Sequence, residues 1–177
     1  MSDARLRWTA SSGLVTGALL GMAGTFAPSA PLRGLAWGID GTALVAATAL
    51  LAVHHLREGR EQLAAGFLVF MVGETLIVSG SAMPLEASAP TFAAGAALWA
   101  AALALVSAAP SWPLFVRVTG ALGALLFAAT AVRMFGGAPL TALSTPLPFY
   151  AYPFLAITLF GWAWVHVRGL SPSKTST

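Results

Sequence analysis

Two acidic residues of this chain lie inside long apolar stretches, where ionisable groups are rare. Asp40 lies within the segment 37–42 and Glu74 within the segment 71–75. A carboxylate at the centre of a membrane-spanning helix costs roughly 2.5–3.5 kcal/mol on insertion scales, so such residues face the bundle interior or a wet cavity. Paired carboxylates in that position can bind a cation or a proton. We therefore take Asp40 and Glu74 as the candidate ligand-binding residues.

The positions of these two residues along their apolar stretches predict a shared pocket. With a rise of about 1.5 Å per residue, Asp40 lies roughly 8 Å and Glu74 roughly 12 Å from the same membrane boundary. Arg133, near that boundary at the end of another apolar stretch, would balance or gate their charge through its long side chain. The alternative is that an Asp40–Arg133 pair only fixes helix packing, while Glu74 is protonated and hydrogen-bonded to a neighbouring helix.

The histidines lie at the opposite ends of the apolar stretches. His55 and His166 are expected at equal depth, where they could ligate a b-type haem axially. Helix-end histidines also cap carbonyl groups or meet lipid headgroups, and that interpretation stays open. The chain has no Cys, which excludes disulfides, thiolate metal centres and covalent c-type haem. Apart from this haem alternative, we expect no cofactor and no metal site.

The sequence lacks the usual signatures of catalysis. It contains no HExxH zinc motif and no Walker-type nucleotide loop. Ser79 and Ser81 lie on the outer side whereas every histidine lies on the inner side, so a serine–histidine dyad is not expected. Lys174, the single lysine, belongs to the polar tail, which excludes a retinal Schiff base inside a bilayer. These residues favour a protein that is not an enzyme.

The composition identifies the solvent that surrounds these residues. Of the 177 residues, 58% are hydrophobic and 8% are charged, whereas soluble domains carry roughly 25% charged residues. Too few charges are available to cover a water-soluble domain of this size. The composition therefore excludes a soluble enzyme, a nucleic-acid-binding module and a disordered chain, and it predicts a protein dissolved in a lipid bilayer.

Apolar stretches of spanning length predict an all-α polytopic membrane protein with six transmembrane helices. A spanning helix needs roughly 20 apolar residues, and Pro, Gly or charged residues separate six such stretches. We expect one domain over residues 1–170 and a polar C-terminal tail over 171–177. The stretches, of which the fourth is the shortest, are 8–26, 35–56, 63–82, 92–108, 114–135 and 149–167.

Basic residues predict the orientation, because cytoplasmic loops of membrane proteins retain Lys and Arg. With both termini inside, the outer side keeps only Arg33 and Arg133. The sequence therefore predicts a cytoplasmic-type membrane, such as a bacterial inner membrane, with both termini in the cytoplasm. The inner side then holds Arg5, Arg7, Arg57, Arg60, Arg117, Arg168 and Lys174.

Part of the sequence occurs twice. Residues 27–53 align without a gap on residues 109–135, sharing Ala-Pro-Ser-x-Pro-Leu and Ala-Ala-Thr-Ala. A true repeat would divide the chain into three-helix halves, 1–83 and 90–170, of opposite orientation, as in many small carriers. The alternative is a common helix-packing pattern of small residues that the chain uses twice.

Two series of glycines predict close helix contacts. Gly13, Gly17 and Gly21 form overlapping GxxxG motifs, which are typical of close helix packing in membranes. This face is a candidate contact between two copies of the chain. The alternative is that it packs against another helix of the same copy. The second series marks one seam of the third stretch, and its members are Gly66, Gly73 and Gly80.

The connection before the last stretch carries two further expectations. The segment 136–147, the longest outer connection, could fold over the polar pocket. Pro153, near the start of the last stretch, would kink the helix if it lay in the interior, because it would free a carbonyl group. The alternative is an ordinary bent start of the helix.

Two hypotheses about function follow. The first is a small transporter or channel-like protein that binds a cation, a proton or a small solute in an outward-facing pocket of Asp40, Glu74 and Arg133. The second is a non-catalytic membrane subunit of a larger complex, or a protein that binds haem, quinone or lipid. Both expect a lipid bilayer as the main partner, allow a homo-oligomer, and leave no role for nucleic acid.

Overall fold

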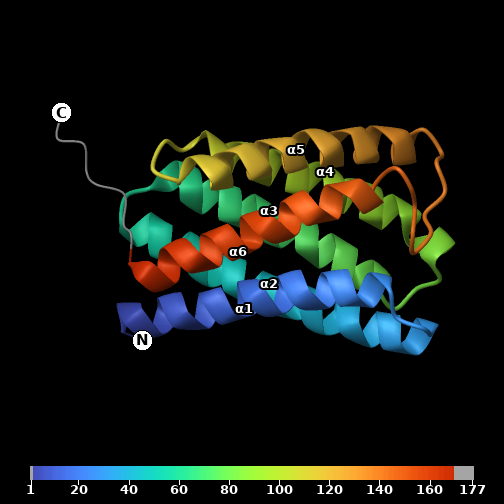
Figure 1. The fold of residues 1–177 in the computed structure, drawn as a ribbon, viewed down its shortest axis with the longest axis horizontal. Helices are drawn as coiled ribbons and strands as arrows, with labels where there is room; N and C mark the ends of the chain where they lie inside the picture. Colours follow the sequence, from blue (N-terminus) through green and yellow to red (C-terminus); the bar gives the residue numbers. More distant parts are fainter. Residues whose placement is uncertain (1, 170–177) are drawn as a thin grey trace.

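The computed structural model describes residues 2–169, which form six α-helices, one short 3-10 helix and no strand (Figure 1). The predicted all-α class is confirmed, and helices α2 to α5 are long and apolar enough to cross a membrane. The polar tail 171–177, with Lys174, lies outside the described residues. The elements are α1 (Asp3–Thr25), α2 (Ala30–Arg57), α3 (Glu61–Gly80), α4 (Leu85–Ala108), α5 (Leu114–Phe135), η1 (Phe149–Ala151) and α6 (Tyr152–Arg168).

Helix α4 is longer than the sequence predicted. The segment before Phe92 was expected to be a loop because it contains Pro84 and Pro90, yet α4 already begins at Leu85. Pro84 precedes the first turn, where backbone N–H groups need no intrahelical partner. Pro90 removes only one hydrogen bond, close to the helix start. The prediction that the fourth helix is the shortest is therefore wrong, because α4 has 24 residues and α6 has 17.

The start of α6 shows why Pro153 does not kink the helix. Tyr152 is the first residue of α6, so Pro153 lies in the first turn, where its missing N–H leaves no carbonyl group unpaired. The 3-10 helix η1 leads directly into this turn. Of the two alternatives for Pro153, the structure has the bent start. At the other end, α6 stops at Gly169, whose φ of 60° is the left-handed conformation that glycine adopts readily.

The six helices form a closed ring in chain order. Each helix packs against its neighbours in sequence, and α6 packs against α1. Within residues 2–169 no other pair of α-helices has Cα atoms within 8 Å of each other, so helices across the ring meet only through their side chains. The start of α1 and the end of α6 lie at one end of the bundle, which we call the terminal end (Figure 1). The connections α1–α2, α3–α4 and α5–α6 lie at the opposite end, which we call the loop end (Figure 1).

Large aromatic side chains fill the centre of the ring. The Phe70 ring stacks on Trp99 with 5.7 Å between the ring centroids, and it meets Trp162 edge-on at 5.8 Å. Trp162 in turn contacts Phe67 at 5.0 Å, and Phe67 stacks on His55 at 5.3 Å. These five side chains form a continuous column of rings, the aromatic column, along the bundle interior.

The GxxxG face of α1 is used within the chain, against α2. A Cβ atom placed on Gly13 would lie 2.9 Å from the Ala43 carbonyl oxygen and 2.9 Å from the Ala47 Cβ. Gly17 and Gly21 continue this contact towards the loop end. The structure therefore has the second of the two alternatives for this face, a contact inside one copy.

The glycine seam of α3 faces α4 over its whole length. Cβ atoms placed on its three glycines would meet α4 atoms at distances between 2.5 and 2.9 Å. Because these glycines have no side chain, the α3 and α4 backbones can approach closely. The contacted residues of α4 are Val106 for Gly66, Leu98 for Gly73 and Thr91 for Gly80.

The outer surface of the ring is apolar as well as its interior. Val132, Leu114 and Leu125 are 74%, 72% and 70% exposed. Helices that are apolar on all sides are typical of membrane spans. Some exposed hydroxyl groups on these faces donate to a carbonyl oxygen of their own helix, as Thr42 does to Gly38 at 2.8 Å. This local pairing is the one that an apolar solvent favours.

The close approach of α1 to α2 gives a direct test with a matched control. Alanine in place of a helical glycine normally stabilises by about 0.5–1 kcal/mol, and we expect that result for Gly38→Ala, because no atom lies within 4 Å of the added Cβ. Gly13→Ala should instead destabilise the protein by about 1–3 kcal/mol, since the added methyl overlaps α2 backbone. Thermal unfolding of both variants in detergent checks this. Equal shifts of both melting temperatures would contradict the described α1–α2 contact.

Candidate functional site

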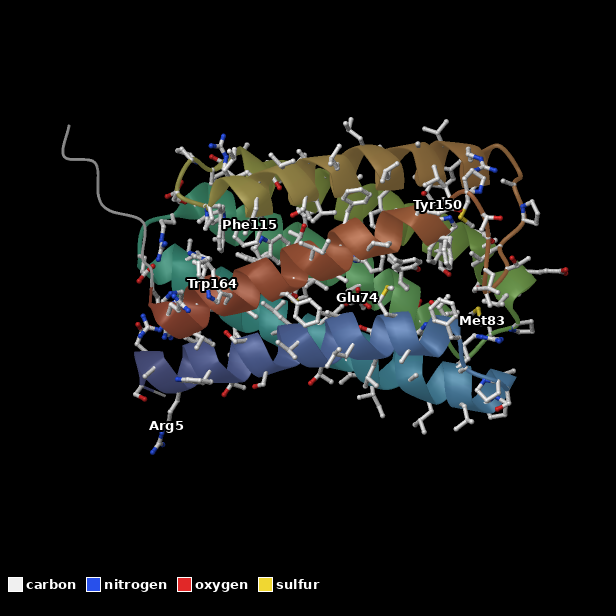
Figure 2. The ribbon with its side chains drawn as sticks, viewed as in Figure 1. Arg5, Glu74, Met83, Phe115, Tyr150 and Trp164 are labelled. Carbon is white, nitrogen blue, oxygen red and sulfur yellow. The ribbon has the colours of Figure 1, made fainter. Side chains whose placement is uncertain are left out.

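One cavity of about 270 Å³ brings Asp40 and Glu74 together. It extends from the middle of the bundle to the loop end. Figure 2 shows Glu74 inside the bundle between its two ends, whereas Met83, which lines the same cavity, lies at the loop end. Helices α1, α2, α3, α4 and α6 contribute to the wall, together with the turns at that end. We call this space the acidic cavity.

The α1 glycines make room for the Asp40 carboxylate. A Cβ on Gly21 would lie 2.8 Å from Asp40 Oδ2, and a Cβ on Gly17 would lie 3.1 Å from Oδ1. The Gly21 carbonyl oxygen also accepts a hydrogen bond from the Trp37 indole at 3.2 Å. Asp40 Oδ1 is nevertheless buried without a hydrogen-bond partner, which is uncommon for a carboxylate oxygen in a folded protein.

Glu74 is almost fully buried, with 2% of its surface exposed. Its Oε1 lies against Gly41 of α2, where an added Cβ would come within 2.9 Å, and its Oε2 has no hydrogen-bond partner. The Trp99 indole is near this carboxylate, but its N–H does not make a hydrogen bond in the described geometry. Gly73 permits this arrangement, because a Cβ there would lie 3.2 Å from the Trp99 ring.

Aromatic side chains from three helices form the wall around the two carboxylates. Trp37 of α2, Trp99 of α4 and Tyr152 of α6 all line the acidic cavity. Sequence reasoning missed all three. Trp37 could have been found, because it is three residues from Asp40 and therefore lies on the same helix face.

The arginine at the acidic cavity is Arg33, and the predicted Arg133 lies elsewhere. Arg133 lines a second cavity, between the end of α5 and the α5–α6 connection. The Arg33 guanidinium instead lies 5.9 Å from the Trp37 ring centroid and donates to the Ala27 carbonyl oxygen at 3.4 Å. The spacing of Arg33, Trp37 and Asp40 places all three on one face of α2, a signal that the sequence prediction overlooked.

The α5–α6 connection reaches the acidic cavity. Leu140, Thr141 and Ala142 of the segment 136–147 line it, as does Pro148 just after that segment. The segment thus forms part of the cavity wall at the loop end. A smaller cavity of about 20 Å³, between α1, α2, α4 and α6, also touches Asp40. A space of that size holds about one water molecule.

At the terminal end, His55 and His166 form a buried hydrogen-bonded pair. His166 Nδ1 lies 2.6 Å from the Trp162 carbonyl oxygen, which can only accept, so Nδ1 carries the proton. With both rings neutral, His55 Nε2–H then donates to His166 Nε2 over 3.2 Å. His55 Nδ1 remains buried without a partner.

This pairing does not fit axial ligation of a haem. Metal–imidazole bonds of about 2.0–2.1 Å would place two opposite ligand nitrogens roughly 4 Å apart, with the porphyrin between them. The Nε2 atoms of His55 and His166 are 3.2 Å apart and face each other directly. The Phe67 ring, parallel to His55 within 5°, and the edge of Trp112 occupy the space beside the pair.

His54 connects the start of α1 to the end of α2. Its Nδ1 lies 3.1 Å from Asp3 Oδ1 and its Nε2 lies 3.6 Å from Glu58 Oε2. Three such groups can hold a metal ion by position alone. Here the Asp3 carboxylate also faces Arg7 at 3.8 Å, and Glu58 forms an ion pair with Arg60. The cluster is therefore an ion-pair network that fastens the terminal end of the bundle.

No protein-family model, curated protein sequence or solved structure matches this chain. The chemistry of the acidic cavity therefore follows from its own residues.

The histidine pair can be tested by a double-mutant cycle with His55→Phe, His166→Phe and the double variant. Removing one ring leaves the other with an unpaired buried polar nitrogen, at a cost of about 1–3 kcal/mol. Replacing both removes that penalty, so we expect a coupling free energy of about 0.5–3 kcal/mol. Denaturant unfolding in detergent provides the measurement. Strictly additive effects would show that the hydrogen bond contributes nothing.

Proposed function

We propose that the chain is a membrane protein whose six helices all span the bilayer, with both termini on the cytoplasmic side. The closed ring supports this, because α1 and α6 pack side by side and complete a bundle whose other helices are of spanning length. The distribution of basic residues supports the orientation. At the loop end lie only Arg33 and Arg133, whereas the other described arginines belong to the terminal end.

An inverted repeat of two three-helix halves is part of this proposal. In the closed ring, contact α1–α6 is the counterpart of contact α3–α4, as a two-fold relation between the halves requires. Thr48 of α2 and its counterpart Thr130 of α5 are both buried, and each donates to the carbonyl oxygen four residues earlier. Asp40 has no acidic counterpart in the second half, because Leu122 occupies the equivalent position of the aligned segment.

We further propose that the acidic cavity binds a cation, a proton or a small cationic solute and passes it across the membrane. One observation carries this proposal: two carboxylates, each with a buried oxygen lacking a partner, line one cavity that reaches the loop end. In the proposed orientation the loop end is outside. Intramembrane carboxylates of this kind mark ion and substrate pathways in many membrane proteins.

The arrangement around the cavity suits alternating access. Asp40 and Glu74 belong to the first half of the chain, whereas Trp99 and Tyr152 belong to the second half. The site thus lies between the proposed repeats, where carriers built from inverted repeats bind their substrates. The aromatic column and the histidine pair fill the bundle between the cavity and the terminal end. Transport then requires the two halves to move relative to each other.

Uptake into proteoliposomes tests the function. We expect uptake of at least one of rubidium ion, methylammonium or protons, and a loss of tenfold or more in Asp40→Asn and Glu74→Gln. The exposed Glu86 at the same end supplies a matched control, since Glu86→Gln should leave uptake unchanged. Absence of uptake for all three cations, or full uptake by both cavity variants, would contradict the proposal.

Thermal unfolding of the same variants separates binding from packing. Asp40 and Glu74 have no ion-pair partner among residues 2–169, so an amide of the same shape should keep or raise the melting temperature. The packing alternative expects a lower melting temperature in both variants. Co-purification of a stoichiometric membrane partner together with loss of stability would favour the alternative role as a subunit.

The proposed topology is tested by cysteine labelling, because the chain has no native Cys. Ala87→Cys, at the loop end, should react with a membrane-impermeant maleimide added to intact cells. Pro110→Cys, in the turn between α4 and α5, should react only after permeabilisation. Both positions are exposed. The reverse pattern would invert the orientation, and labelling of both positions from one side would exclude α4 as a membrane span.

A further inference from the structure

The acidic cavity holds two carboxyl groups for which residues 2–169 offer no ion-pair partner. Glu74 Oε2 and Asp40 Oδ1 are buried and have no hydrogen-bond partner. The nearest cationic group of the cavity wall, Arg33, lies over Trp37 and donates to a backbone carbonyl instead. A buried carboxylate without a partner is costly, so the cavity is suited to a ligand that brings a positive charge or hydrogen-bond donors.

The wall around these carboxylates is poor in the oxygen ligands that a metal ion requires. Mg²⁺ requires six ligands in octahedral geometry, and Ca²⁺ takes about 6–8 oxygen ligands. The hydroxyl groups of Thr25, Ser81 and Ser88 line the cavity, but they lie at or next to helix ends, towards the loop end and away from Asp40 and Glu74. Trp37, Trp99 and Tyr152 line the same cavity, together with the aliphatic Ile77 and Val78.

The aromatic side chains provide what an organic cation requires. Tryptophan and tyrosine faces attract cations within about 6 Å of the ring centroid, and rings from several elements form the cages that bind quaternary ammonium groups. Trp37, Trp99 and Tyr152 approach the cavity from three different helices. Trp37 already carries one cation on its face, since the Arg33 guanidinium lies 5.9 Å from its centroid.

The volume limits the size of the ligand. Sites for drug-sized molecules measure about 300–1,000 Å³, and the acidic cavity measures about 270 Å³. We infer that the acidic cavity takes a small organic ammonium ion, with its charge at Asp40 and Glu74 and its apolar substituents against Trp37, Trp99 and Tyr152. This inference rests on the proposed function and names the class of its substrate.

Binding measurements on the purified full chain in nanodiscs test the ligand class without any substitution. The probes are tetramethylammonium, choline, the neutral carbon isostere of choline, and rubidium ion. We expect saturable binding of tetramethylammonium and choline at one site per chain. The neutral isostere and rubidium should bind at least tenfold more weakly, because one lacks the charge and the other lacks the apolar surface.

Variants then assign the binding to the cavity. Trp37→Leu and Tyr152→Leu should each weaken choline binding about tenfold, while Trp37→Phe, which keeps an aromatic face, should weaken it less. Trp8→Leu is the matched control, since Trp8 lies on the outer surface of α1 with 61% exposure, and it should leave binding unchanged. Melting temperatures establish that each variant is folded.

The outcomes separate this inference from the proposed function. Equal binding of choline and its neutral isostere would overturn the inference. Rubidium binding or proton uptake that depends on Asp40 and Glu74, without binding of either ammonium probe, would also overturn it while leaving the proposed function intact. If no cation binds and none is taken up, both the inferred ligand class and the proposed function are overturned.

Discussion

Burying a carboxylate in an apolar helix bundle costs free energy of folding unless another group pairs with it. This chain has two such carboxylates, Asp40 and Glu74. Glu74 is 2% exposed and no arginine pairs with it or with Asp40 among residues 2–169. Residues of five helices and of the loop-end turns line the cavity that holds these two groups. Glycines on α1 and α2 lie against the carboxylates, and a glycine on α3 lets α4 place Trp99 beside Glu74. The helix packing and the site therefore depend on the same small residues.

The two ends of the bundle treat ionisable groups in opposite ways. At the terminal end, His54 faces Asp3 and Glu58, and His166 pairs with a backbone carbonyl and with His55, so that His55 Nδ1 is the one histidine nitrogen without a partner. At the loop end, oxygens of Asp40 and Glu74 are left without partners. Polar groups with satisfied hydrogen bonds give a rigid structure, whereas unsatisfied ones are found where a ligand acts. The histidines thus connect helices at the terminal end, whereas the proposed function rests on the unpaired carboxylate oxygens towards the loop end.

The sequence was sufficient for the all-α class and for placing Asp40 and Glu74 in one cavity, because both depend on where apolar stretches begin and end. It was not sufficient for the start of α4, since proline near a helix start costs much less than proline in its interior. The pairing of Asp40 with an arginine depended on contacts between distant helices, and no pattern within α5 shows which cavity Arg133 faces. Trp99 and Tyr152 were missed for the same reason. The positions of Arg33 and Trp37 at the cavity, in contrast, could have been predicted, because their helical spacing places them on the same face of α2 as Asp40.

The closed ring of helices also has a consequence for the connectivity of the chain. Because α6 packs against α1, the start of α1 and the end of α6 are neighbours at the terminal end (Figure 1). Gly169 lies beside the Arg7 side chain. A short peptide could join these ends, and the chain could begin at another connection without altering which helices touch. The contacts between the helices therefore do not depend on which helix comes first in the sequence, and the bundle is suited to circular permutation.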